Sequence, residues 1–153
     1  MQSVLNLKSC IGLLPQYVEL RNNYCELLLT HSVELYETNR WIKNTSAEIR
    51  VIEEENFILG VVLLYVDRGG EIAFFAKQQN RGIGTRLLNI VEDIANEIKL
   101  PLIWAWVRED NHVAAKVFNK CGYSMSGCED RTYKEQTIRG IRYTKALSEQ
   151  TTP

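Results

Sequence analysis

The sequence has little of what marks several special classes of protein. It contains only 4 cysteines and 3 prolines, and the cysteines show no CxxC or zinc-like spacing. The longest apolar run, FILGVVLLYV, is too short to span a bilayer. The first residues, MQSVLNLKSC, lack the charged region and apolar core of a secretory signal. We therefore expect free thiols in a reducing, cytoplasmic compartment, with no metal site and no membrane segment.

The sequence also has no large excess of either positive or negative charge. The formal net charge is −1, and lysine and arginine are scattered along the chain rather than clustered. This balance disfavours a general nucleic-acid binder and a polybasic membrane patch. With 153 residues, 45% of them apolar, and no repeat or proline-rich linker, the sequence predicts one globular domain over residues 1–153. The expected partner is a small molecule, while the sequence leaves a homodimer open.

Hydrophobic periodicity predicts a mixed α/β sheet. The clearest helix runs from residue 84 to 99, because Leu87, Leu88 and Val91 recur on one face. The segment PLIWAWV at 101–107 is typical of a strand buried on both faces. Further helices are expected at 14–30, 33–44 and from Asp110 or Asn111 to 121; further strands are expected at 3–9, 47–54, 57–67, 71–76, 123–133 and 137–147.

The stretch QNRGIGT, at 79–85, places glycines at the start of the clearest helix. Backbone N–H groups that lack partners at a helix N-terminus attract anions, and glycine lets a phosphate approach them closely. Arg81 can add charge, and Thr85 can add a hydroxyl donor. The spacing fits neither a Walker P-loop nor a dinucleotide fingerprint, whose third glycine is replaced by Leu87. A tight structural turn with no ligand is the alternative.

This turn and the segment after it resemble the GNAT superfamily of acyl-CoA-dependent N-acyltransferases. The family's Gln/Arg-x-x-Gly-x-Gly/Ala turn is matched by Gln79, Gly82 and Gly84. Its second motif is a strand that ends near an Asn, followed by a helix with small residues. This helix ends in the pattern aromatic-x-x-x-Gly-aromatic. The matching residues are Asn111, Ala114, Ala115, Phe118, Gly122 and Tyr123. The resemblance covers residues 71–123.

The resemblance implies a mixed, mostly antiparallel central sheet, flanked by helices and splayed between its fourth and fifth strands. Acetyl-CoA would place its diphosphate on residues 79–85 and its pantetheine arm between the splayed strands. Asn111 would hold the arm, or serve only as a helix cap. The residues expected to bind the cosubstrate are Phe75, Ala76, Gln79, Asn80, Arg81, Gly82, Ile83, Gly84, Thr85 and Asn111.

Acetyl transfer to an amine needs a proton acceptor and a leaving thiolate. Glu71 is the candidate base, because its strand resembles that of the histone acetyltransferases; otherwise it is an exposed residue after a turn. The tyrosine that usually protonates the thiolate is replaced by Phe118, so Tyr123, another tyrosine or water would act instead. Cys121, at the end of a helix, fits a structural role better than an acyl-enzyme, which favours direct transfer in a ternary complex.

The acceptor is the least determined part of the prediction. The segment 20–42 resembles a subgroup that acts on amino sugars of nucleotide-sugar pathways. Arg21 and Asn22 are candidate acceptor-binding residues, although Arg21 could instead pair with a surface carboxylate. The alternatives are a protein N-terminal or lysine acetyltransferase, a non-catalytic acyl-CoA-binding domain, and an unrelated α/β interaction domain.

Overall fold

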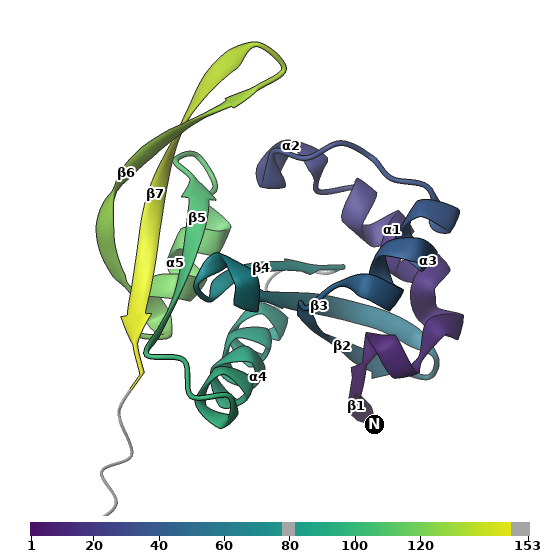
Figure 1. The fold of residues 1–153 in the computed structure, drawn as a ribbon. Coiled ribbons are helices and arrows are strands. Elements are labelled where there is room, and N and C mark those ends of the chain that lie inside the picture. Colours follow the sequence, from purple (N-terminus) through teal and green to yellow (C-terminus); the bar gives the residue numbers. More distant parts are fainter. Residues whose placement is uncertain (78–81, 148–153) are drawn as a thin grey trace, which may run out of the picture.

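The computed structural model describes residues 1–77 and 82–147, which form a twisted sheet with helices on both faces (Figure 1). The strands are β1 (Gln2–Asn6), β2 (Glu48–Glu54), β3 (Phe57–Tyr65), β4 (Glu71–Ala76), β5 (Leu102–Arg108), β6 (Ser124–Tyr133) and β7 (Gln136–Ala146). The helices are α1 (Leu14–Asn22), α2 (Cys25–Leu28), α3 (Leu35–Asn44), α4 (Ile83–Glu97) and α5 (His112–Lys120), with 3₁₀ turns at Leu7–Ser9, Ile11–Leu13 and Val66–Arg68.

The predicted order of elements is confirmed, with two local differences. The first strand ends at Asn6, whose side chain accepts a hydrogen bond from the backbone N–H of Lys8 and starts a 3₁₀ turn. The long helix expected at 14–30 is divided, because α1 ends at Asn22 and the short α2 closes at Leu29 in the left-handed region, with φ of 52°.

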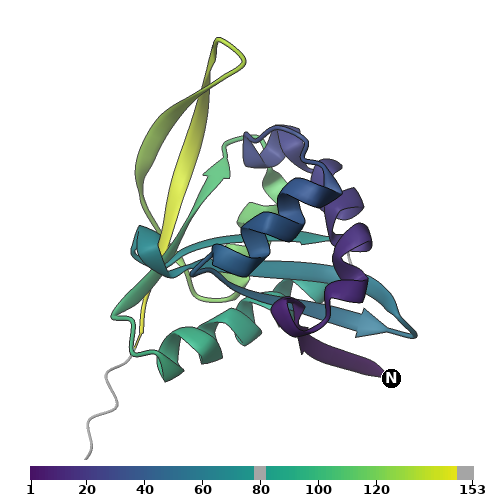
Figure 2. The ribbon, with the colours of Figure 1, turned by 45° about the vertical axis from the view of Figure 1, so that its right-hand side comes forward.

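The sheet is antiparallel except at one junction. Its strand order is β1-β2-β3-β4-β5-β7-β6, and only the β4–β5 pair is parallel among the described residues. A parallel pair needs a crossover connection, and α4 provides it. In the described chain β4 and β5 pair only where Glu71 lies beside Trp104, after which the two strands diverge (Figures 1 and 2). The predicted splay between the fourth and fifth strands is confirmed.

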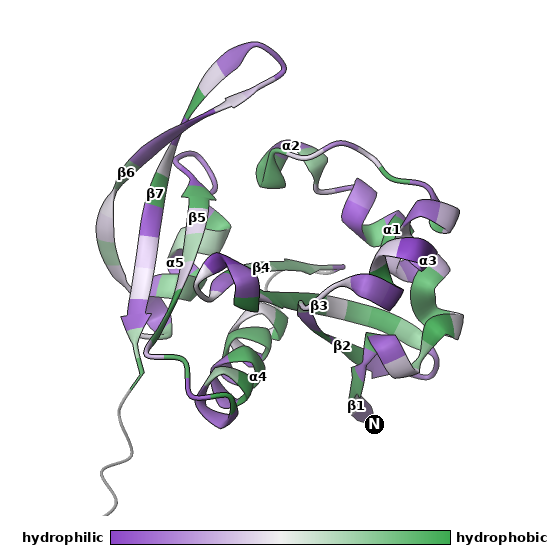
Figure 3. Cartoon of the chain, viewed as in Figure 1, coloured by the Kyte–Doolittle hydropathy of each residue, from purple (hydrophilic) through white to green (hydrophobic). Residues whose placement is uncertain are grey.

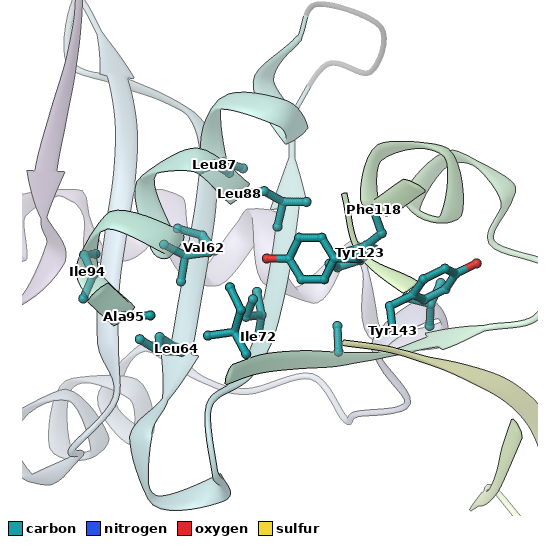
Figure 4. Packing of buried hydrophobic residues seen from close by; sticks show 14 of the residues in the cluster. Val62, Leu64, Ile72, Leu87, Leu88, Ile94, Ala95, Phe118, Tyr123 and Tyr143 are labelled. Atoms are coloured by element: carbon teal, nitrogen blue, oxygen red, sulfur yellow. The ribbon is translucent and has the colours of Figure 1, made fainter. Parts of the chain in front are cut away.

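Each face of the sheet has its own apolar core. On one face, the stripe of α4 that includes Leu87, Leu88 and Val91 packs with α5 against the sheet (Figure 4). On the other face, α1 and α3 cover the first four strands through residues such as Tyr17 and Ile42. Figure 3 shows the hydrophobic residues concentrated along β3 and β4, between these layers. Within the described ranges, no helix has the length and hydropathy that crossing a membrane requires.

Candidate active site

The splay exposes backbone groups of β4. Phe75 pairs with Val61 of β3, and the N–H of Lys77 donates to the carbonyl of Leu59 at 2.8 Å. Backbone groups alternate in direction along a strand, so those of Phe74 and Ala76 point toward the gap beside β5. The hydroxyl of Tyr24 donates to the carbonyl oxygen of Ala76, which fits this orientation. The backbone groups of Phe75 are therefore used by β3, and those that could meet a bound arm belong to Phe74 and Ala76.

The side chain of Phe75 has a different role. It is 2% exposed, and its ring stacks on those of Tyr17 and Tyr24 with centroids 5.9 and 5.7 Å apart. The ring therefore joins β4 to the helical segment above it, and forms part of the floor of the cleft described below.

The glycine turn leads into α4 as expected. Gly82 is the N-cap residue, with φ of 74°, and no side chain caps the helix. A left-handed φ favours glycine, because other residues meet a steric cost there. The first N–H groups of α4 therefore lack intrahelical partners, which suits an anion. Gln79, Asn80 and Arg81, also predicted to bind the cosubstrate, lie outside the described residues.

The other residues of the turn face the protein interior. A Cβ on Gly84 would lie 3.2 Å from Cε2 of Phe74 and 3.4 Å from Val117, so this glycine lets α4 pack closely against β4 and α5. The side chain of Ile83 is buried in the core, and Thr85 is half-buried. The structure thus supplies a packing reason for Gly84, where the sequence suggested phosphate access.

A cleft of about 540 Å³ opens between the helical segment 17–41 and the diverging strands. Aromatic side chains line much of it: Tyr17, Trp41, Tyr65, Phe74, Phe75, Trp106 and Phe118. Asn111 also lines the cleft, and its side-chain oxygen accepts a hydrogen bond from the N–H of Ala114 at 3.2 Å. The capping role of Asn111 is therefore present, and its position also suits contact with a bound arm.

Glu71 lies at the start of β4 on the wall of this cleft and is only 9% exposed. Its two carboxylate oxygens pair with different guanidinium groups: Oε1 with Arg68 at 3.1 Å and Oε2 with Arg131 at 3.4 Å. The alternative of an exposed residue after a turn is therefore wrong. A buried carboxylate beside the splay can accept a proton, directly or through water, from an amine bound in the cleft.

Tyr123, the tyrosine named as a candidate proton donor, lies away from the cleft. Tyr123 is 4% exposed, and its hydroxyl is directed into the core near Leu88 and Val62 (Figure 4), with no hydrogen-bond partner in the described chain. Burial raises the pKa of Tyr123 above its ordinary value. The ring contacts Phe118 edge-on at 4.9 Å, but Tyr123 does not line the cleft within the described residues. This position disfavours Tyr123 as the acid.

Arg21 and Asn22 hold the loop that follows α2. Arg21 donates to the carbonyl of His31 and to Oγ1 of Thr30, both at 2.8 Å, and in the described chain it pairs with no carboxylate. Asn22 exchanges two hydrogen bonds of 3.0 Å with the backbone of Val33. Arg21 also lines the cleft, so its expected contact with an acceptor stays a prediction.

The tip of the β6–β7 hairpin closes over this loop. The hydroxyl of Tyr133 donates to the carbonyl of Thr30 at 2.9 Å, and the ring of Tyr133 stacks on His31. Lys134 pairs with Glu26 at 2.9 Å. The hairpin and the loop therefore bound one end of the cleft, although the hairpin belongs to a distant part of the sequence.

Sequence reasoning missed an arginine–tryptophan cluster on the sheet. The guanidinium of Arg131 lies 4.7 Å from the ring centroid of Trp106, and that of Arg142 lies 3.7 Å from the ring of Trp104. Trp106 lies flat against Gly140, where a Cβ would come within 2.0 Å of the indole. No spacing along the chain signals this cluster, because its members come from three different strands.

Comparisons with known proteins agree with this geometry. The model of the acetyltransferase (GNAT) family matches residues 14–123. Among solved structures, an N-acetyltransferase from Staphylococcus aureus Mu50 has a TM-score of 0.85 at 15% identity, covering 97% of this chain and 99% of that chain.

Two further solved structures are similar in fold. The ribosomal-protein-alanine N-acetyltransferase from Brucella melitensis has a TM-score of 0.81 at 18% identity, covering 95% of this chain and 99% of that chain. The spermidine N-acetyltransferase from Vibrio cholerae, in complex with CoA and spermine, has a TM-score of 0.80 at 20% identity and 95% coverage of both chains. No curated protein sequence matches significantly.

Proposed function

Because the chain belongs to the acetyltransferase (GNAT) family, we propose that it moves an acetyl group from acetyl-CoA to a primary amine by direct attack in a ternary complex. The acceptor proposed is an amino sugar or a nucleotide-linked amino sugar. The observation that carries the proposal is the gap between β4 and β5, which opens beside both the N-terminus of α4 and the aromatic cleft.

The groups along this gap suit the cosubstrate. The backbone of Phe74 and Ala76 can pair with the amides of a pantetheine arm as an added strand would. The N–H groups at the start of α4 can donate hydrogen bonds to the diphosphate, with residues 79–85 as the turn and Asn111 against the arm. Acetyl-CoA supplies the activated thioester.

Glu71 is proposed as the base for the acceptor amine. A lysine-like amine has a pKa near 10.4, about 3.4 pH units above pH 7, so it is mostly protonated. Forming the neutral amine at pH 7 therefore costs roughly 4.6 kcal/mol. Glu71, directly or through water, takes a proton from the ammonium group, and the neutral nitrogen then bonds to the thioester carbonyl carbon and releases a second proton to water. The carbon–sulfur bond then breaks, and CoA leaves as a thiolate. A thiol has a pKa near 8.5, so departure does not need a strong acid.

Two observations bear on the acceptor. The segment 20–42, whose sequence resembles enzymes of amino-sugar pathways, supplies Arg21 and Trp41 to the cleft wall. A protein N-terminus or lysine is the second candidate, since one structural neighbour is named as a ribosomal-protein-alanine N-acetyltransferase. Phe118, which replaces the usual tyrosine, packs between the rings of Phe74 and Tyr143.

The test is a panel of amines offered with acetyl-CoA, in which release of the CoA thiol is followed by a colorimetric reagent. Amino sugars, nucleotide-linked amino sugars, peptides with free N-termini and polyamines form its arms. We expect turnover in the first two arms. CoA binding without release in any arm would favour a non-catalytic domain. Absence of thermal stabilisation by CoA would remove the proposal altogether, since a ligand of the native state raises the unfolding temperature.

A further inference from the structure

The cleft carries an excess of positive charge. Among the described residues that line it, the ionisable groups with a formal charge at neutral pH are three arginines and two glutamates, which leaves a net charge of +1. The lining residues concerned are Arg21, Arg68, Arg131, Glu37 and Glu71. Adding the neighbouring pair of Arg142 and Glu129, which are 3.8 Å apart, leaves this balance unchanged.

Two of the arginines converge on one carboxylate. Arg68 and Arg131 pair with opposite oxygens of Glu71, so a single negative charge stands between two positive ones. Arg131 is also bound to Glu129 through Nε at 2.9 Å. In the described chain, hydrogen bonds use one nitrogen of Arg68 and two of Arg131, so guanidinium N–H groups remain for another acceptor.

Both guanidinium groups lie over aromatic rings. Arg68 lies 4.1 Å from the ring centroid of Tyr65, and Arg131 lies 4.7 Å from that of Trp106. Tyr65 and Trp106 themselves line the cleft. A guanidinium that lies against a ring can still donate hydrogen bonds from its edge. The planar arrangement of its N–H groups matches a carboxylate or a phosphate.

From this cluster we propose that the acceptor is a primary amine that also carries an oxyanion, a carboxylate or a phosphate, bound by Arg68 and Arg131. This inference rests on the proposed acetyl transfer and narrows its acceptor. An oxyanion placed there would be a further negative group beside Arg68 and Arg131, in addition to Glu71 and Glu129, while Glu71 faces the amine. A polycationic acceptor such as a polyamine would add positive charge beside both arginines, and is disfavoured.

The experiment compares matched acceptors with the full-length chain and acetyl-CoA. Glucosamine 6-phosphate against glucosamine isolates a phosphate, β-alanine against its amide isolates a carboxylate, and spermidine represents the polycation. We expect kcat/KM for at least one anionic member to exceed that of its neutral partner by roughly 10- to 100-fold, the range for hydrogen bonds to a charged group. Added salt should raise the KM of the anionic member.

Variants assign the effect to the two arginines. Arg131→Gln and Arg68→Gln should each lower the ratio of kcat/KM between the anionic and the neutral member, mainly through KM. Arg139→Gln is the matched control, because Arg139 lies on the same hairpin, pairs with Asp130 at 3.9 Å and does not line the cleft in the described chain. The control should leave the ratio unchanged. Equal losses in all three variants would overturn the assignment.

Calorimetric binding of the same amines in the presence of CoA separates this inference from the proposed reaction. Binding of an anionic amine that Arg131→Gln abolishes, without acetylation, supports the anion site and rejects the transfer. Acetylation of neutral or cationic amines as fast as of anionic ones rejects the anion site and supports the transfer. Neither binding nor turnover in any arm rejects both.

Discussion

Replacing Gly82 by alanine should separate a ligand-binding turn from a merely structural one. Gly82 has φ of 74°, and among the described residues a Cβ there would meet nothing within 4 Å. The cost to folding is therefore that of a left-handed backbone alone, about 1–2 kcal/mol. For a chain of this length each kcal/mol lowers the melting temperature by about 2–4 °C, so we expect a decrease of roughly 2–8 °C.

The loss of CoA affinity in Gly82→Ala should be larger than the backbone strain alone would cause. If the turn holds the diphosphate on backbone N–H groups, the added methyl group interferes with that contact. Loss of one hydrogen bond to a charged group costs about 1.5–3 kcal/mol, which weakens CoA binding roughly 10- to 100-fold. Isothermal titration with CoA measures the affinity, and thermal unfolding of the same samples measures the stability.

Gly122→Ala supplies the matched control. Gly122 also has a left-handed φ, of 87°, and its Cβ would meet only the end of the Lys145 side chain, at 3.8 Å. The strain is the same in kind, but Gly122 follows α5 and has no part in the turn. We expect a similar decrease in melting temperature with CoA affinity unchanged. If both variants bind CoA as the unmodified protein does, the role given to the turn is refuted.

Four further outcomes test the site. Glu71→Gln should lower kcat by about 10²- to 10⁴-fold, with partial recovery as the pH nears 10 because the amine then deprotonates unaided; a pH-independent deficit in CoA release would contradict a base role. Tyr123→Phe removes a buried hydroxyl without a described partner, so urea unfolding should show a gain of about 1 kcal/mol with unchanged turnover; lost turnover would restore Tyr123 as the acid. Asn111→Ala should cost about 1 kcal/mol in the free energy of unfolding, whereas Asn111→Ser keeps the cap; a raised KM for acetyl-CoA in both would show contact with the arm. Burial raises the pKa of the Cys121 thiol, so less thiolate forms at a given pH, and mass spectrometry after alkylation at pH 7.5 should find exposed Cys128 modified first; equal rates would argue against this.

Hydrophobic periodicity predicted the helices and strands well, because each element depends mainly on residues that are close in the sequence. The apolar stripe of α4 and the alternation along the strands report which faces are buried, whereas the splay between β4 and β5 was expected from the resemblance to the GNAT superfamily. The break after Asn22 was not predicted. The apolar run that follows continues the helical pattern, while Arg21 and Asn22 bind the backbone of residues 31 and 33 and turn the chain away.

The candidate site was predicted only in part, because some of its residues lie far apart in the sequence. Glu71 could be proposed from its strand, but its partner Arg131 lies 60 residues further along the chain. Such pairings depend on register between strands, which single-sequence patterns do not contain. Gly82 and Gly84 show another limit: one motif holds two glycines, yet the first is required by backbone angle and the second by close packing.

The cover that arginines give to Trp104 and Trp106 also bears on solubility. Bare indole rings on a sheet face would form an exposed apolar patch, which favours association between molecules. A helix laid over Trp106 would fill the cleft. The planar guanidinium groups of Arg131 and Arg142 instead cover the two rings with a thin polar layer. The cleft therefore stays open without exposing a bare apolar wall.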